Sequence, residues 1–236
     1  MKVTWLGQAG LLFETGKTII LVDPYLSDSV AKVQPLNKRR VPVDRRFFDI
    51  RPDVIICTHD HLDHTDLETL NRYLSDKSEI LCLAPFSAWN RMRALGGQKN
   101  RYVMFNAGTE WTERDVRFRA VCAEHSDPYA IGVQIEAEGK IYYVTGDTLY
   151  SENIFAKLPS ERIYALFLPV NGYGNNMNAT DAARFSARVH AQYTIPVHFG
   201  LFDSISAKEF VCAGRIIPEI YREIPFPDEN KGDCIQ

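Results

Sequence analysis

The sequence predicts an α/β protein in which two mixed β-sheets pack face to face and helices cover their outer faces. Three observations support this prediction. The chain of 236 residues is 45% hydrophobic, which is enough to bury a large core. Short strand-like runs occur first, and strand and helix patterns then alternate. The same order returns in the second half, from residue 116 onward, so each half suits one sheet with its own helices.

The first half begins with an antiparallel meander, because Gly7, Gly10 and Gly16 separate three strand-like runs. Residues 27–48 then lose apolar periodicity and contain prolines and a basic run, which predicts an ordered loop or flap rather than a domain linker. A loop of this length is usually functional or mobile. The following apolar run at 53–57 is typical of a strand buried on both faces. The remaining expected elements are strands at 2–6, 11–13, 18–22, 79–83 and 102–105, and helices at 66–74 and 86–95.

The second half also begins with strand-like runs, and strand and helix patterns then alternate. A tight hairpin at Glu138 and Gly139 joins two of its strands, and Asn178 or Thr180 is the expected N-cap of its helix. The tail after Pro225 is polar and is expected to be irregular. We expect one domain over residues 1–236, with the flap as an insertion. The expected elements are strands at 116–123, 131–137, 140–145, 163–170 and 193–197, and a helix at 179–191.

Composition excludes several classes of protein. The net charge of -3 and the lack of a basic face with interleaved aromatic residues argue against a nucleic-acid partner. No apolar run reaches eighteen residues and the start lacks the layout of a signal peptide, so we expect a cytoplasmic protein without a membrane partner. A homo-oligomer stays open. The cysteines lack CxxC spacing and predict neither disulfides nor a thiolate metal site: Cys57, Cys82, Cys122, Cys212 and Cys234.

Histidines cluster in one short segment. Three of the six histidines in the chain, His59, His61 and His64, lie together with Asp63 in the segment HDHLDH. Imidazole and carboxylate are good ligands for divalent ions, and a short loop lets closely spaced side chains converge on one. The alternative is a solvated polar loop, but three crowded imidazoles would then lower one another's basicity without a compensating ligand. The segment therefore predicts a metal site.

Three further candidates each follow a predicted strand: His125, Asp147 and His198. Taken singly, they could be a surface histidine, a turn aspartate and a hydrogen-bonded core histidine. Strand ends converge in α/β folds, so together with the HDHLDH segment they predict one shared site. The sixth histidine, His190, lies in the helix at 179–191 without ligand-like neighbours and is expected to be structural or solvated.

The order of these motifs resembles the metallo-β-lactamase superfamily: THDHLDH, a later histidine, a GDT aspartate and a final PVHFG histidine. The resemblance implies an αβ/βα four-layer sandwich with two divalent metal ions, Zn or Mn, at one edge. Asp23, in the segment LVDP, matches the early aspartate of the superfamily and is expected to support a ligand by a hydrogen bond. The implied ligands are His59, His61 and His125 for one ion, Asp63, His64 and His198 for the other, and Asp147 as the bridge.

Within the superfamily, the segments WLGQAG, GDTLYS and NGYG resemble the L-ascorbate-6-phosphate lactonase group of small metal-dependent hydrolases. This resemblance implies a hydrolase in which a metal-bridging hydroxide attacks a lactone of a phosphorylated sugar acid, an anionic small molecule. Asp63 or Asp147 is the expected catalytic proton acceptor, although a carboxylate bound to metal is a weak base. Tyr173 and Thr180 are candidate substrate contacts, with simple packing as the alternative for Tyr173.

The flap carries local positive charge. Its segment 38–46 contains five basic residues and one acidic residue, Asp44, so the net charge of that segment is five minus one, or +4. We expect Arg39 and Arg40 to hold the phosphate of such a substrate, because a guanidinium can bind phosphate through two hydrogen bonds. A solvated loop or a subunit contact is the alternative. The five basic residues are Lys38, Arg39, Arg40, Arg45 and Arg46.

Two other functions compete with the lactonase. A phosphodiesterase or nuclease of the same superfamily would use the same metal ions, but the negative net charge gives a nucleic acid no basic track. A non-hydrolytic, iron-dependent oxidoreductase of the same fold would need fewer ligands and more open coordination positions than the seven candidates provide.

Overall fold

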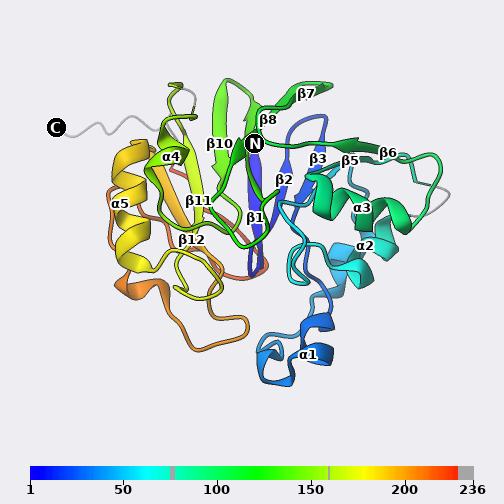
Figure 1. Ribbon diagram of the computed structural model, residues 1–236, viewed down its shortest axis with the longest axis horizontal. Coiled ribbons are helices and arrows are strands. Elements are labelled where there is room, and N and C mark those ends of the chain that lie inside the picture. The colour runs from blue at the N-terminus through cyan, green and yellow to red at the C-terminus, as the bar shows by residue number, and fades with distance from the viewer. Residues whose placement is uncertain (75–77, 159, 228–236) are drawn as a thin grey trace.

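The computed structural model describes residues 1–74, 78–158 and 160–227. Within these residues, the strands form two mixed sheets that pack face to face (Figure 1), as the sequence predicts. The seven-stranded sheet has the order β13-β1-β2-β3-β4-β5-β6. Its strands are β1 (Lys2–Gly7), β2 (Gly10–Glu14), β3 (Ile19–Val22), β4 (Val54–Ile56), β5 (Leu81–Ala84), β6 (Arg101–Met104) and β13 (Arg222–Glu223).

The second sheet has six strands in the described chain, in the order β12-β11-β10-β9-β8-β7. Its bounds are β7 (Glu110–Glu113), β8 (Val116–Cys122), β9 (Ile131–Ala137), β10 (Lys140–Val144), β11 (Ala165–Pro169) and β12 (Tyr193–Val197). Between the two sheets lies a continuous hydrophobic core. Phe13 of the first sheet meets Tyr142 and Phe167 of the second edge to face, with ring centroids 6.0 and 5.6 Å apart.

Helices form the two outer layers (Figure 1). Leu70, Ala88 and Met92, from α2 (Leu67–Tyr73) and α3 (Phe86–Ala94), pack on the outer face of the seven-stranded sheet. Ile154 and Phe185, from α4 (Glu152–Phe155) and α5 (Ala179–Val189), cover the six-stranded sheet. This gives the four layers expected from the sequence.

Helix α5 settles which residue is its N-cap. The Asn178 side chain accepts a hydrogen bond from the backbone N–H of Asp181, and Asn178 rather than Thr180 is therefore the cap. At the other end, His190 is the C-cap in the left-handed conformation, with φ of 55°. His190 is structural in this sense and lies apart from the other five histidines.

The flap was expected to be an ordered loop, and the structure adds short helical elements to it. It contains α1 (Ser29–Val33) and the 3-10 turns η1 (Pro35–Asn37) and η2 (Arg45–Asp49). Phe47 explains part of the order, because its buried ring stacks on Tyr221 with centroids 5.3 Å apart. Asp44 also caps η2 by accepting from the backbone N–H of Arg46.

Four elements escaped the sequence analysis: β7, β13, α4 and η3 (Ala207–Glu209). Each is four residues or shorter, and the two strands have no fully buried residue, so no apolar period marked them. The expected irregular tail is described only to residue 227, and residues 228–236 lie outside the described residues. None of the helices in the described part of the chain is long and apolar enough to cross a membrane.

The strand directions explain where a site can form. Strands β1, β3 and β4 run parallel to one another in the first sheet, and β8, β10, β11 and β12 do so in the second. Their carboxyl ends therefore lie along one edge of each sheet. The segments that follow these ends carry Gln8, Asp23, the HDHLDH segment, His125, Asp147 and His198.

Candidate metal centre

The HDHLDH segment forms a compact turn between β4 and α2. The carbonyl of His61 accepts the backbone N–H groups of His64 and Thr65 at 3.1 and 2.8 Å, and the Thr65 hydroxyl donates to the carbonyl of His59 at 2.7 Å. Helix α2 begins directly afterwards, with Asp66 as its N-cap. The backbone hydrogen bonds are thus satisfied within the turn, and the imidazoles are left to face the sheet edge.

Three histidines form the first group of possible metal ligands. His59, His61 and His125 each offer a ring nitrogen, and these nitrogens all lie within 4.8 Å of one another. His125 Nε2 lies 3.3 Å from His61 Nδ1. His59 is fully buried, whereas His61 and His125 are partly exposed.

Asp63, His64 and His198 form the second group, with ligand atoms again within 4.8 Å of one another. Asp63 Oδ2 is 3.2 Å from His198 Nε2 and 3.8 Å from His64 Nε2. The six side chains thus separate into the two trios implied by the resemblance, although four of the residues come from one six-residue segment.

Asp147 lies between the two trios. It forms a third group of possible ligands with His59 and His64. Its two oxygens point to different histidines: Oδ1 is 3.3 Å from His64 Nε2, and Oδ2 is 3.2 Å from His198 Nε2. The preceding Gly146 has φ of +63°, and a Cβ there would lie 2.7 Å from the carbonyl oxygen of Ile131. Only glycine fits this approach, which brings Asp147 to the cluster.

Asp23 supports the cluster from behind, as expected. Its buried carboxylate accepts hydrogen bonds from Thr58 N at 2.7 Å and Thr58 Oγ1 at 2.6 Å. Asp23 Oδ2 also lies 2.7 Å from His64 Nδ1. This contact fixes the ring so that Nε2 faces Asp147 and Asp63.

Two amide side chains, which the sequence analysis did not place in the cluster, also touch it. The Gln8 amide donates to Asp63 Oδ2 at 2.9 Å and lies 3.0 Å from His198 Nε2. The Asn176 amide donates to Asp147 Oδ2 at 2.8 Å, and its oxygen accepts from the backbone N–H of Thr148 at 3.1 Å. Each amide orients one carboxylate of the cluster.

Backbone strain is concentrated at the site. Gln8, Asp23 and His198 have φ of 51°, 45° and 60°, in the left-handed region that non-glycine residues seldom adopt. Hydrogen bonds hold two of them: the Gln8 carbonyl accepts both the Trp5 indole N–H and the His198 backbone N–H, each at 2.9 Å. Strained residues of this kind often mark functional sites.

Three polar atoms in the cluster are buried and have no hydrogen-bond partner: His59 Nε2, His64 Nε2 and Asp147 Oδ1. Burial of such atoms costs free energy unless another group satisfies them. All three belong to the possible ligand atoms of one group. Divalent metal ions match this donor set of imidazole nitrogen and carboxylate oxygen, so the residues present fit the metal ions that the resemblance implies.

The pKa values indicate a negative potential at the second trio, whereas burial lowers the pKa of His59 and His125 in the first. Burial acts to lower the pKa of His64, but Asp147 and Asp23 outweigh it and hold this pKa well above its usual range. Burial opposes the same effect at His198, where Asp147 and Asp63 raise the pKa to about 9. Two imidazoles that favour a proton show that positive charge is stabilised here, which also favours a bound cation.

A cleft of about 520 Å³ opens beside the cluster. Side chains of the cluster, including Asp63, Asp147 and His198, form its floor. The flap contributes one wall through α1 and η1, and the segment between β11 and α5 contributes another. Tyr173 lines this cleft and its side chain is largely exposed, so the structure places it within reach of a molecule bound at the cluster.

The other expected substrate contacts lie elsewhere. Thr180 is exposed at the start of α5 and lines a different surface depression, on the outer face of that helix. Arg39 and Arg40 do not line the cleft. The Arg39 guanidinium is held instead by the carbonyls of Tyr25 and Val41, at 2.8 and 3.2 Å, and by a contact to Tyr221 Oη. Each of its three nitrogens is therefore engaged in a hydrogen bond within the protein.

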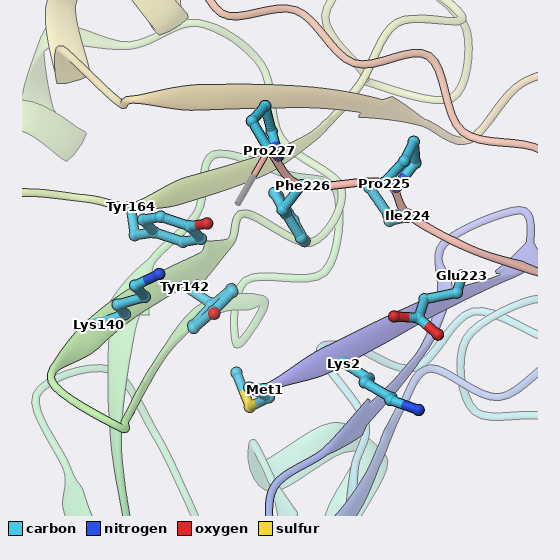
Figure 2. Close-up of a pocket in the computed structure, with 10 residues that line it drawn as sticks. All are labelled: Met1, Lys2, Lys140, Tyr142, Tyr164, Glu223, Ile224, Pro225, Phe226 and Pro227. Atoms are coloured by element: carbon cyan, nitrogen blue, oxygen red, sulfur yellow. The ribbon is translucent and has the colours of Figure 1, made fainter. Parts of the chain in front are cut away.

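A second cavity, of about 320 Å³, lies at the opposite ends of the strands, near the starts of β1 and β10 (Figure 2). Three aromatic residues, Tyr142, Tyr164 and Phe226, are part of its lining, and the Lys140 amine lies 3.9 Å from the centre of the Tyr164 ring. None of the predicted site residues lines it. The cleft beside the histidines is therefore the better candidate for a substrate.

Comparison with known proteins shows the family of the chain. The sequence model of the family described as "Beta-lactamase superfamily domain" matches residues 18–199. A "UPF0173 metal-dependent hydrolase" from Geobacillus sp. is 30% identical over 222 residues, which cover 87% of this chain and 88% of the relative. Its counterpart from Oenococcus oeni is 26% identical over 244 residues, covering 96% of this chain and all of the relative (100%). These relatives give no support to the finer resemblance to the lactonase group.

Solved structures show the same fold. A possible metal-dependent hydrolase from Veillonella parvula superimposes with a TM-score of 0.77 at 18% identity, covering 95% of this chain and 98% of that one. The metallo-β-lactamase fold protein YhfI from Bacillus subtilis gives 0.70 at 19% identity, covering 94% and 98%. An isothiocyanate hydrolase from Delia radicum gut bacteria gives 0.72 at 18% identity, covering 96% and 99%. The chain therefore belongs to the metallo-β-lactamase superfamily and, within it, to the UPF0173 family of metal-dependent hydrolases.

Proposed function

We propose that this chain hydrolyses a carbonyl electrophile, such as a lactone or ester, at two divalent metal ions held by the seven clustered side chains. The observation that carries the proposal is the set of three buried, unpartnered ligand atoms on His59, His64 and Asp147. One ion would be held by the trio of His59, His61 and His125, and the other by the second trio. Zn and Mn both accept such nitrogen and oxygen ligands.

Two ions held there would lower the pKa of a shared water and polarise the electrophile that it attacks. The residues of the chain do the rest. Asp147 shares one group of possible ligands with His59 of the first trio and His64 of the second, so it would serve as the ligand common to both ions. Asp23 fixes the ring of His64, and Gln8 fixes Asp63. Asp63 or Asp147 remains the proposed proton acceptor, because both carboxylates lie on the floor of the cleft.

The rival functions fit the site less well. A phosphodiesterase or nuclease needs cations for the rest of its anionic substrate, and neither Lys nor Arg is among the described residues that line the cleft. A single-iron oxidoreductase would leave one trio without an ion. The phosphorylated sugar lactone expected from the sequence meets the same objection as the phosphodiesterase. The substrate that we propose therefore keeps the carbonyl group of the phosphorylated sugar lactone but has no phosphate.

A metal-reconstitution assay tests this function. Metal-free protein is loaded with Zn or Mn and tested on γ-lactones, p-nitrophenyl esters, an aryl isothiocyanate and bis(p-nitrophenyl) phosphate. We expect metal-dependent turnover of a carbonyl or isothiocyanate substrate and its loss with a chelator. Activity confined to the phosphodiester, or activity that survives removal of the metal, would contradict the proposal.

A further inference from the structure

The walls of the cleft carry an uneven set of charges. Among its described lining, no Lys or Arg accompanies the two histidines of the metal cluster and four aspartates, and two of these aspartates, Asp63 and Asp147, belong to the same cluster. The other two lie away from it. Asp60 pairs with Arg91 at 2.8 Å, and Asp203 accepts the backbone N–H groups of Gly200 and Ile205 at 3.0 and 2.8 Å. A negatively charged group bound beyond the cluster would therefore face the Asp203 carboxylate and the ion-paired Asp60, with no Lys or Arg among the described lining.

The nearby cation of the flap cannot compensate for them without breaking existing contacts. The Arg39 guanidinium holds two backbone carbonyls and contacts Tyr221, and it also lies over the ring of Tyr25, 5.2 Å from its centre. Arg46 pairs with Asp44 at 2.6 Å. The net charge of +4 already counts the pairing with Asp44, and its four carriers do not line the cleft: Lys38, Arg39, Arg40 and Arg45.

The remaining lining is apolar or amide. Val30, Leu62 and Phe202 belong to one small hydrophobic cluster under the flap, and all three line the cleft. Val33 on α1 and Tyr173 on the facing segment also line it, and they expose 63% and 72% of their surface. Large apolar surfaces that face a cleft gain free energy when an apolar group covers them.

We propose that the part of the substrate outside the metal cluster is uncharged and partly apolar, with Val33 as a specificity-determining contact. This inference rests on the proposed function, since it takes the cluster as the reacting centre. Amide side chains at Gln34, Asn37 and Asn171 supply the polar contacts that such a substrate needs. The substrate class is thus a neutral ester, lactone or comparable small electrophile with an apolar substituent.

Hydroxamates test the proposal without requiring turnover, because a hydroxamate group binds divalent metal ions directly. Butyrohydroxamic acid and succinic monohydroxamic acid have similar lengths and differ at the far end, which is a methyl group in one and a carboxylate in the other. Calorimetry with the metal-loaded protein should give a Kd at least about 10-fold lower for the butyryl compound. Equal binding, tighter binding of the succinyl compound, or no binding of either would overturn the inference.

Two variants locate the effect. Val33→Lys places a cation on the wall of the cleft and should shift the ratio of the two Kd values by at least about 10-fold toward the succinyl compound. Leu36→Lys adds the same charge to the flap at a side chain that is 96% exposed and does not line the cleft. This control should shift the ratio by less than about 3-fold.

Equal shifts in both variants would overturn the assignment of Val33, because the effect would then come from the overall charge of the flap. A change of oligomeric state in Val33→Lys alone, seen by light scattering, would also overturn it and identify the apolar rim as a subunit contact. The failure of the proposed function has a separate signature. Selective hydroxamate binding without hydrolysis of any lactone, ester or isothiocyanate of the panel would refute the function and leave the binding inference intact.

Discussion

Asp23 offers a sharp test of how the cluster is held together. Its carboxylate accepts three hydrogen bonds, all at 2.6–2.7 Å, from the backbone and hydroxyl of Thr58 and from the ring of His64. In Asp23→Ala, the Thr58 hydroxyl can turn elsewhere, but the Thr58 N–H and His64 Nδ1 stay buried without an acceptor. At about 1–3 kcal/mol for each unpaired donor, the free energy of unfolding of the metal-free protein should fall by roughly 2–6 kcal/mol.

The same substitution should weaken metal binding, because His64 would no longer be fixed with Nε2 toward Asp147. Loss of a hydrogen bond behind a metal ligand typically lowers metal affinity by about 10–100-fold. Asp23→Asn keeps the shape but offers one acceptor oxygen, so its effect on both quantities should be smaller. Urea unfolding measures the stability, and competition with a chromogenic chelator measures the metal affinity.

Asp53→Asn is the matched control. Asp53 also accepts a backbone N–H, from Ile19 at 2.9 Å, but it lies at the start of β4, away from the cluster. This variant should lose stability and keep its metal affinity. Unchanged metal affinity in Asp23→Ala, or an equal loss in Asp53→Asn, would refute the account of His64.

Three further predictions follow from single contacts. Asp147→Asn should fold, lose one metal ion and lose hydrolysis, because a neutral amide is a poor bridge between two cations; near-normal turnover would remove Asp147 from the site. Arg39→Ala should lower the free energy of unfolding by about 1–3 kcal/mol in urea titrations, because it leaves the buried Tyr25 carbonyl without this donor. Arg40→Ala removes an exposed side chain and should change the free energy of unfolding by less than about 0.5 kcal/mol. Equal effects of the two substitutions would contradict the contacts described for Arg39. Gly146→Ala should destabilise the fold by about 2 kcal/mol more than Gly139→Ala, because both have positive φ but only Gly146 lacks space; equal melting temperatures would contradict this.

Much of the site was predictable because its residues are scarce types at strand ends. His125, Asp147 and His198 each follow a strand, and strands that run in one direction end at one edge, so their convergence followed from order alone. The two trios needed the resemblance, since spacing within the HDHLDH segment does not assign each histidine to an ion. The structure adds the distances that separate them.

The amides could not be predicted in the same way. Gln8 and Asn176 are ordinary polar residues in turns, and nothing local distinguishes them from solvated ones. Gln8 is positioned by its left-handed backbone and by long-range hydrogen bonds to its carbonyl, neither of which leaves a periodic signal in the sequence.

The flap shows a second limit. Its basic residues suggested a phosphate site, but charge in a sequence does not reveal which charges are paired. Arg39 is held by carbonyls of the flap and the preceding segment, and Arg46 is paired with Asp44. The order of the flap also depends on the contact of Phe47 with Tyr221, which lies 174 residues later in the printed sequence, since 221 minus 47 is 174. A contact at that separation gives no local pattern.

We propose above that the seven clustered side chains hold two divalent ions in each chain. The most direct test is to reconstitute metal-free protein with Zn or Mn, remove unbound metal, and measure metal by inductively coupled plasma mass spectrometry against protein by amino-acid analysis. We expect about two ions per chain in the fully active enzyme and a lower ratio of metal to protein in Asp147→Asn. A ratio of one metal ion per chain in fully loaded, fully active enzyme, unchanged in Asp147→Asn, would contradict a site for two ions.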